Sequence, residues 1–166
     1  MKKLMIIGLL LVLLSGCTSQ EAFEQVSDVW VPETPMAREV SLSLPEDVSV
    51  EVMENDNSGK LYMCDGYTVS LHTTVSGDLD RTLREFTGFS KDNLQVIETK
   101  IGKLKRYDCV WSAAGEGNDQ ISRMSILDDG NFHYVLTATG DASSIKELNS
   151  VWQKIFQSFS LSDTND

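Results

Sequence analysis

Apolar and polar side chains alternate along much of this chain, and this pattern restricts its fold more than any other feature. In the clearest run, residues 67–75, every second side chain from Tyr67 onward is apolar except Thr73, and those between them are polar. A period of two is typical of a β-strand with one buried and one partly solvated face. Similar runs predict further strands over residues 40–44, 48–52, 61–64, 94–101, 104–114, 121–127 and 131–139. We therefore expect a mostly antiparallel sheet of six or seven strands, with hairpin turns at 102–103 and 128–130.

The period changes to that of a helix after Asp78. Leu79, Leu83 and Phe86 fall on one side of a helix that Asp78 can cap at its start and Gly88 can end. A helix of this kind can cover an apolar face of the sheet.

A second and broader helical stripe lies near the end of the chain. Ser144 and Glu147 have the spacing of a capping box, which predicts where this helix begins. Its apolar side is formed by Ile145, Leu148, Trp152, Ile155, Phe156 and Phe159. A sheet with two main helices that seal its apolar faces gives the expected fold class, a layered α+β domain.

The first 17 residues combine a basic start, a short apolar run and a cysteine. Lys2 and Lys3 precede an apolar run over residues 4–14, which is shorter than the about 20 residues that a membrane-spanning helix needs. These features and the small residues 15 and 16 are typical of a cleaved secretory signal. Residues 14–17 also resemble the bacterial lipobox, in which the cysteine receives a diacylglycerol before cleavage. We therefore expect residues 1–16 to be a signal peptide and Cys17 to become an acylated N-terminus (palmitate being one such acyl group).

An acylated Cys17 implies a cellular location and one partner, the membrane. Two or three acyl chains hold a protein durably on a bilayer. The expected location is the extracytoplasmic face of the cell membrane, or the outer membrane if the cell has two.

The remaining chain is strongly acidic. The full sequence has 14 basic and 25 acidic side chains, and loss of Lys2 and Lys3 changes its net charge from −11 to −13. Such a surface repels nucleic acids and anionic lipid headgroups, so neither is an expected partner. A hydrophobic content of 41% argues against a disordered chain.

The composition changes near residue 39. Residues 17–38 are interpreted as a lipidated tether, because they are polar at first and contain Pro32 and Pro35. Residues 39–162 are the expected globular domain, and residues 163–166 are expected to fray. Within the tether, Phe23, Val26, Val29 and Trp30 have helical spacing, which fits a short helix docked on the domain or a contact with the membrane or a partner.

Two cysteines remain besides Cys17. Cys64 and Cys109 both lie in expected strands, and outside the membrane two thiols can form a disulfide if the strands bring them together. The sequence leaves this pairing open and favours two separate core residues. Their spacing is not that of a Cys-x-x-Cys redox motif.

Few side chains have the chemistry of a catalytic site. His72 and His133 are the only histidines, and neither has the spacing of a metal-binding motif. No Gly-x-Ser-x-Gly motif marks a nucleophilic serine. Cys109 alternates with Tyr107 and Trp111 on an expected core face, which disfavours a cysteine nucleophile. We predict no catalytic, cofactor-binding or metal-binding residues and no cofactor.

One acidic loop invites comparison with a calcium site. Counted from Glu54, the residues Asp56, Ser58, Gly59 and Asp65 occupy positions 3, 5, 6 and 12 of a twelve-residue loop. The EF-hand uses oxygen ligands and a glycine at these positions. Here the residue types at positions 1, 5 and 12 depart from that pattern and the flanks have strand character, so a polar hairpin is favoured.

Three segments resemble PsbP-like domains. Residues 40–46, with the sequence Val-Ser-Leu-Ser-Leu-Pro-Glu, are similar to the strand that opens those domains, and residues 131–137 and 151–159 resemble their C-terminal half. The resemblance covers about residues 39–162. It implies an α/β/α sandwich around an antiparallel sheet, a fold shared with Mog-type proteins and with many bacterial lipoproteins. It carries no catalytic residue to this chain, and fold alone is a weak guide to function.

The functional expectation is a noncatalytic binding or accessory lipoprotein that engages an envelope protein or a small ligand. Two alternatives stay open at this point. One is a surface hydrolase or metal-dependent enzyme, which requires a cleft where a histidine meets an acidic side chain. The other is a passive structural protein of the envelope.

Overall fold

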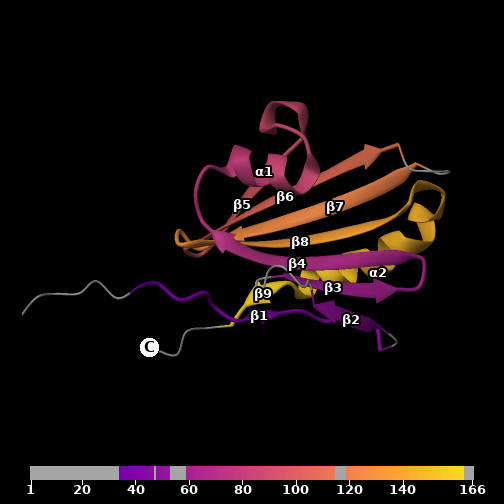
Figure 1. The fold of residues 1–166 in the computed structure, drawn as a ribbon, viewed down its shortest axis with the longest axis horizontal. Coiled ribbons are helices and arrows are strands. Elements are labelled where there is room, and N and C mark those ends of the chain that lie inside the picture. The colour runs from indigo at the N-terminus through magenta and orange to yellow at the C-terminus, as the bar shows by residue number, and fades with distance from the viewer. Residues whose placement is uncertain (1–33, 47, 53–58, 115–118, 163–166) are drawn as a thin grey trace, which may run out of the picture. The chain divides into compact units, whose positions relative to one another are not determined.

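The computed structural model describes residues 34–46, 48–52, 59–114 and 119–162 (Figure 1). All elements below belong to one compact unit, Pro35–Asp166. The predictions for Cys17, for the tether helix and for three calcium-loop residues (Glu54, Asp56 and Ser58) fall outside the described residues. Within the described part of the chain, no helix is both long enough and apolar enough to cross a membrane.

A seven-stranded sheet forms the centre of the domain. Its strands are β2 (Ser49–Val52), β3 (Gly59–Cys64), β4 (Tyr67–Val75), β5 (Ile97–Ile101), β6 (Leu104–Ala113), β7 (Gln120–Asp128) and β8 (Phe132–Asp141). They lie in the order β2-β3-β4-β8-β7-β6-β5, and every neighbouring pair is antiparallel. The prediction of an antiparallel sheet of six or seven strands is therefore confirmed.

A separate two-stranded sheet joins the two ends of the domain. Strand β1 (Val40–Ser41) pairs with β9 (Ser160–Leu161). The alternation over residues 40–44 predicts a longer first strand. The structure shortens it because its partner has only two residues to pair, while Leu42 and Leu44 still pack against the core.

Helix α1 (Leu79–Thr87) has the predicted ends. The side chain of Asp78 accepts a hydrogen bond from the Asp80 N–H at 3.1 Å, and Gly88 ends the helix with a φ of 78°. Glycine adopts this left-handed conformation without the steric cost that a Cβ atom brings.

Helix α2 (Ile145–Ser158) begins differently from the prediction. A 3-10 turn, Ala142–Ser144, precedes it, and Asp141 accepts a hydrogen bond from the Ser143 N–H at 2.8 Å. The Ser144 side chain makes no capping bond, so the predicted capping box is wrong. The extra turn moves the unpaired N–H groups upstream, to the position that Asp141 can reach.

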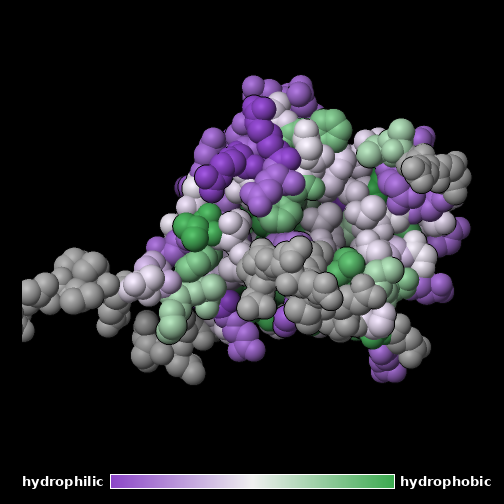
Figure 2. Space-filling model, viewed as in Figure 1, coloured by the Kyte–Doolittle hydropathy of each residue, from purple (hydrophilic) through white to green (hydrophobic). Residues whose placement is uncertain are grey.

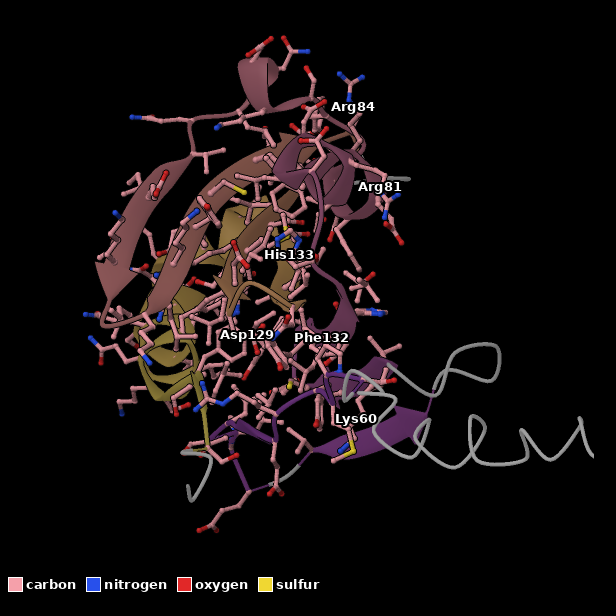
Figure 3. All side chains as sticks on the ribbon, turned by 90° about the vertical axis from the view of Figure 1, so that its left-hand side faces the viewer. Lys60, Arg81, Arg84, Asp129, Phe132 and His133 are labelled. Carbon is pink, nitrogen blue, oxygen red and sulfur yellow. The ribbon has the colours of Figure 1, made fainter. Side chains whose placement is uncertain are left out.

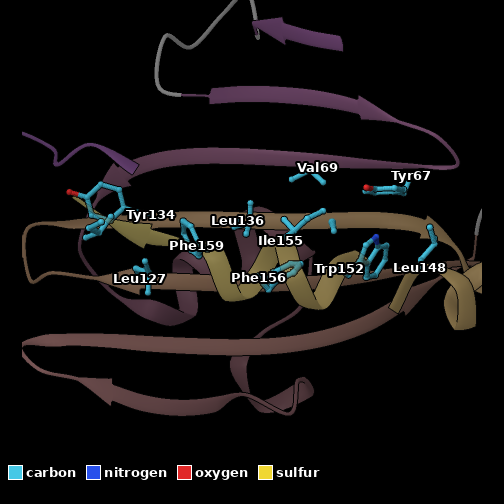
Figure 4. Close-up of a cluster of buried hydrophobic side chains, with 12 residues drawn as sticks. Tyr67, Val69, Leu127, Tyr134, Leu136, Leu148, Trp152, Ile155, Phe156 and Phe159 are labelled. Carbon is cyan, nitrogen blue, oxygen red and sulfur yellow. The ribbon is translucent and has the colours of Figure 1, made fainter. Parts of the chain in front are cut away.

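The two helices lie on opposite faces of the sheet. One cluster joins α2 to the sheet and includes Trp152, Ile155 and Phe156 (Figure 4). The other cluster includes Leu83 of α1 together with residues of β6, β7 and β8. The layers are therefore helix, sheet and helix, as the α/β/α expectation required. We call the two sides of the sheet the α2 face and the α1 face.

Candidate functional site

A groove of about 690 Å³ opens on the α2 face where the β5–β6 and β7–β8 hairpins turn. Its apolar side chains come from the sheet and the C-terminal strand, and include Leu104, Leu127, Phe159 and Leu161. Its polar side chains are Arg38, Lys103, Asp129, Asn131 and Ser160. An apolar floor with a few polar groups, at a volume of several hundred Å³, is typical of sites for small ligands. Figure 3 views this end of the domain and labels Asp129 and Phe132.

Tyr134 holds one wall of the groove in place. Its fully buried hydroxyl accepts a hydrogen bond from the Arg38 N–H at 2.7 Å and donates one to Asp129 Oδ2 at 2.9 Å. Burial, aided by the hydrogen bond to Asp129, raises the pKa of Tyr134 to about 12, so the hydroxyl keeps its proton. Asp129 also accepts from the N–H groups of Asn131 and Phe132, and the position of its carboxylate on the rim is therefore fixed.

Arg38 joins this wall to the C-terminal strand. Its guanidinium donates to the Ser162 carbonyl oxygen, with Nε at 3.1 Å, and the Ser162 N–H donates to the Glu39 carbonyl oxygen at 2.8 Å. Residues more than 120 positions apart in the sequence thus meet at the groove. The space-filling view shows hydrophobic patches at the left-hand end of the domain and a mostly hydrophilic surface over α1 (Figure 2).

His133 lies in a buried polar cluster on the α1 face, away from the groove. Its side chain is 1% exposed, with Nδ1 2.9 Å from Thr82 Oγ1 and Nε2 3.2 Å from Ser76 Oγ. Ser76 donates in turn to Asp128 Oδ1 at 3.1 Å, and Asp128 Oδ2 is 3.9 Å from Nε2. Burial lowers the pKa of His133 below its usual 6.5 against the opposing effect of Asp128 and Asp129. The cluster links α1 to the ends of β4, β7 and β8.

This cluster contains a serine, a histidine and an aspartate, but not in the arrangement of a catalytic triad. In a triad the carboxylate binds one imidazole nitrogen and the serine binds the other. Here Asp128 and Ser76 lie on the same side of the ring, and Thr82 occupies the opposite nitrogen. With 1% of the side chain exposed, a substrate cannot reach the imidazole.

His72 occupies the polar side of β4, as the alternation predicts. It is half-buried, and its ring lies 5.0 Å from that of Phe86 on α1. His72 does not line the groove. Within the described residues, no group of three or more potential ligands could hold a metal ion.

The two cysteines that could have paired are far apart in the sheet. Cys64 lies on β3 and packs against the α2-face cluster, whereas Cys109 lies on β6 in the α1-face cluster. Strands β4, β8 and β7 separate them, and both are free thiols in the structure. Of the two interpretations that the sequence left open, the structure shows two separate core residues. Burial raises the pKa of Cys109 to about 11, which makes it a poor nucleophile.

Sequence reasoning did not find the groove. Its polar residues lie in four separate segments and share no motif spacing. Residues 128–130 were predicted as a turn; in the structure β7 includes Asp128, and the turn is formed by residues 129–131. Nothing local indicates that Asp129 is joined to Arg38 through Tyr134. The pairing of β1 with β9 decides that arrangement.

No protein-family model matches this chain, and no curated protein matches it. Solved structures do resemble it. A protein of Bacteroides thetaiotaomicron is 15% identical with a TM-score of 0.51, and the match covers 76% of this chain and 46% of that one. This chain therefore spans less than half of the Bacteroides protein.

A second resemblance is to a variant of the protein Mog1. It is 11% identical with a TM-score of 0.50, and the match covers 75% of this chain and 92% of that one. LpqN of Mycobacterium tuberculosis, described as involved in cell envelope biogenesis, is 14% identical with a TM-score of 0.49, covering 80% and 88% of the two chains. At these identities the comparisons show the fold alone. That fold is α+β, and its neighbours include Mog1, as the resemblance to PsbP-like and Mog-type domains implied.

Proposed function

We propose that this protein is a lipid-anchored, extracytoplasmic binding or accessory module without catalytic activity. The groove at the β1–β9 end of the domain is the surface that engages its partner, a small ligand or a segment of an envelope protein. The observation that carries this proposal is the groove itself, with Leu127, Phe159 and Leu161 beneath it and Arg38, Lys103 and Asp129 around it. An apolar part of a ligand fits the floor, and its polar groups fit the rim.

The anchor rests on the sequence. Residues 14–17 have the lipobox pattern, and the acyl chains on Cys17 would hold the domain at the membrane surface. The strongly acidic composition supports this arrangement, because a domain that repels anionic headgroups needs a covalent lipid to stay close to them.

The surroundings of His133 support a role without catalysis. The hydrolase alternative needs a cleft in which a histidine meets an acidic side chain. His133 meets Asp128, but it does so in the protein interior and not at the groove. Its hydrogen bonds to Thr82 and Ser76 serve to hold α1 on the sheet.

The first experiment purifies the full chain from its native membrane and identifies what copurifies. Met36→Glu and Lys103→Glu alter exposed groove residues, and Val75→Glu places the same new charge at an exposed site outside the groove. We expect a partner or ligand that Val75→Glu retains and that the two groove variants lose. Equal retention by all three variants would contradict the groove assignment. If no partner or ligand copurified with the parent chain or with any variant, the passive structural role would be favoured.

The second experiment measures the intact mass of the membrane-derived protein. We expect the mass of a chain that begins at Cys17 and carries a diacylglycerol. Cys17→Ala should leave the membrane fraction or retain its signal peptide. An unmodified Cys17 would contradict the anchor and leave the groove to be judged on its own.

A further inference from the structure

Strand β5 is an open edge of the seven-stranded sheet. It is the last strand in the sheet order, and all five of its side chains are exposed. In Figure 4 it lies at the edge opposite to β2. Its sequence, Ile-Glu-Thr-Lys-Ile, has apolar residues at both ends and two opposite charges on either side of Thr99. An edge strand offers a row of backbone groups with which another strand can pair.

The hairpin shows which backbone groups of β5 face outward. Ile101 and Leu104 flank a two-residue turn, with a φ of 62° at Gly102. Residues that flank such a turn form a hydrogen-bonded pair, and hydrogen-bonded and non-hydrogen-bonded pairs then alternate along the ladder. The N–H and C=O groups of Ile97, Thr99 and Ile101 therefore face β6. Those of Glu98 and Lys100 face the open edge.

In an antiparallel pairing of this strand with its own copy, each side chain can lie opposite one of matching chemistry. We propose that two copies of the chain associate through β5, with Thr99 opposite Thr99 of the second copy. Glu98 then lies opposite the second copy's Lys100, and Ile97 lies opposite its Ile101. In this register Glu98 and Lys100, whose backbone groups face outward, are opposite each other and form the hydrogen-bonded pairs. The backbone geometry and the charges therefore select the same register.

The neighbouring registers lack this complementarity. A shift that places Glu98 opposite its own copy puts two carboxylates together, and a shift that places Lys100 opposite its own copy puts two ammonium groups together. Like charges that face each other across an antiparallel pair are destabilising. A single charge would protect an edge from pairing, whereas opposite charges at two positions select one pairing.

The apolar residues of this edge lie on one face. Ile97 and Ile101 are 59% and 51% exposed, and Val110 of β6 is 54% exposed on the same α2 face. In the proposed dimer the isoleucines of the two copies become neighbours, and the two sheets become one continuous sheet. A contact through one short strand is smaller than a typical stable interface, so the association is expected to be weak and reversible.

Disulfide trapping of Thr99→Cys in the purified full chain tests the proposed register. Opposite Cα atoms in a non-hydrogen-bonded antiparallel pair are about 4.5 Å apart, within the range of a disulfide. We expect oxidation to give covalent dimers of this variant above the level of the parent chain, which controls for Cys17, Cys64 and Cys109. Ser112→Cys, exposed on β6 beyond the residues that pair with β5 and outside the proposed contact, should stay at the parent level.

Charge exchange in the Thr99→Cys background then tests the pairing of Glu98 with Lys100. Glu98→Lys or Lys100→Glu alone places like charges opposite each other twice in the dimer, and each should reduce trapping about ten-fold. The combined exchange restores opposite charges and should restore trapping. Circular dichroism confirms that these surface variants fold. Trapping that is absent, that equals the Ser112→Cys level, or that the combined exchange does not restore would overturn the proposal.

Discussion

The two faces of the sheet are covered by helices that are attached in different ways. On the α2 face, Trp152, Ile155 and Phe156 are almost fully buried in a broad apolar cluster. On the α1 face, the helix buries only Thr82 and Leu83, and Thr82 is hydrogen-bonded to His133. The long helix is thus held by apolar area, which is insensitive to pH. The short helix depends on one fully buried leucine, on the partly buried Leu79 and Phe86, and on a polar cluster whose central residue can be protonated.

Helix α2 also has polar contacts, on the side that faces β6. Arg106 donates to Ser125 Oγ at 2.8 Å and to the Phe156 carbonyl oxygen at 3.0 Å, and it pairs with Asp108 at 3.0 Å. Arg123 lies 4.4 Å from the centre of the Phe156 ring. Helix α2 has no basic residue in its own last turn, so the sheet supplies the cation that its free carbonyl groups favour.

The largest expected effect is on the α2 face. Trp152 is 2% exposed and packs beside Tyr67, with ring centroids 6.2 Å apart. We expect Trp152→Ala to lower the free energy of unfolding by about 3–5 kcal/mol, because it leaves a large cavity. Urea denaturation followed by circular dichroism measures this. Trp111→Ala, at a half-buried site on the α1 face, is the matched control. If it lowered the free energy of unfolding more than Trp152→Ala does, the α2 face would not be the more strongly packed one.

Leu83 provides the apolar half of the α1 attachment. It is fully buried among Tyr107, Met124 and Ile126. Leu83→Ala should lower the free energy of unfolding by about 2–4 kcal/mol. Hydrogen exchange should show α1 losing protection before α2 does. If both helices lose protection together, the two faces are more tightly coupled than their separate clusters indicate.

His133 provides the polar half, and its effect depends on pH. Its pKa is lowered in the folded protein, so the unfolded chain binds the proton more tightly. The stability that neutral His133 contributes is complete above pH 6.5 and is lost as the pH falls through its folded pKa. We expect thermal unfolding of the parent to shift to lower temperature over this range, and His133→Gln to flatten that dependence.

The half-buried His72 serves as the control for this titration. His72→Gln should retain most of the pH dependence. If the two variants respond alike, the buried cluster is not the source of the sensitivity.

The smallest expected effects concern the start of α2. Asp141→Ala removes the cap of the 3-10 turn and should cost about 1 kcal/mol, as should Asp78→Ala at α1. Ser144→Ala should change stability by less than about 0.5 kcal/mol, because its side chain makes no capping bond. If Asp141→Ala and Ser144→Ala lowered the free energy of unfolding equally, the result would support the capping box that the sequence predicts.

The elements that were predicted well are those whose signals are local. The alternation over residues 67–75 matches β4, and Asp78 and Gly88 mark both ends of α1. The errors in strand length arose where a distant partner decided the outcome. Strand β5 begins at Ile97 rather than at residue 94, after a 3-10 turn at Lys91–Asn93. Its pairing with β6 ends where Ile97 lies opposite Asp108.

The sequence by itself determined the fold class, the faces of the strands and the helical stripes, because hydrophobic periodicity is a local consequence of backbone geometry. It also provides the basis for the predicted anchor at Cys17. Tertiary structure alone decided that Arg38 meets Ser162, that Tyr134 ties Asp129 to the groove wall, and that Cys64 and Cys109 lie on opposite faces. Arg38 is 124 positions from Ser162 and 96 from Tyr134, and only the pairing and layering of the strands bring such distant residues together.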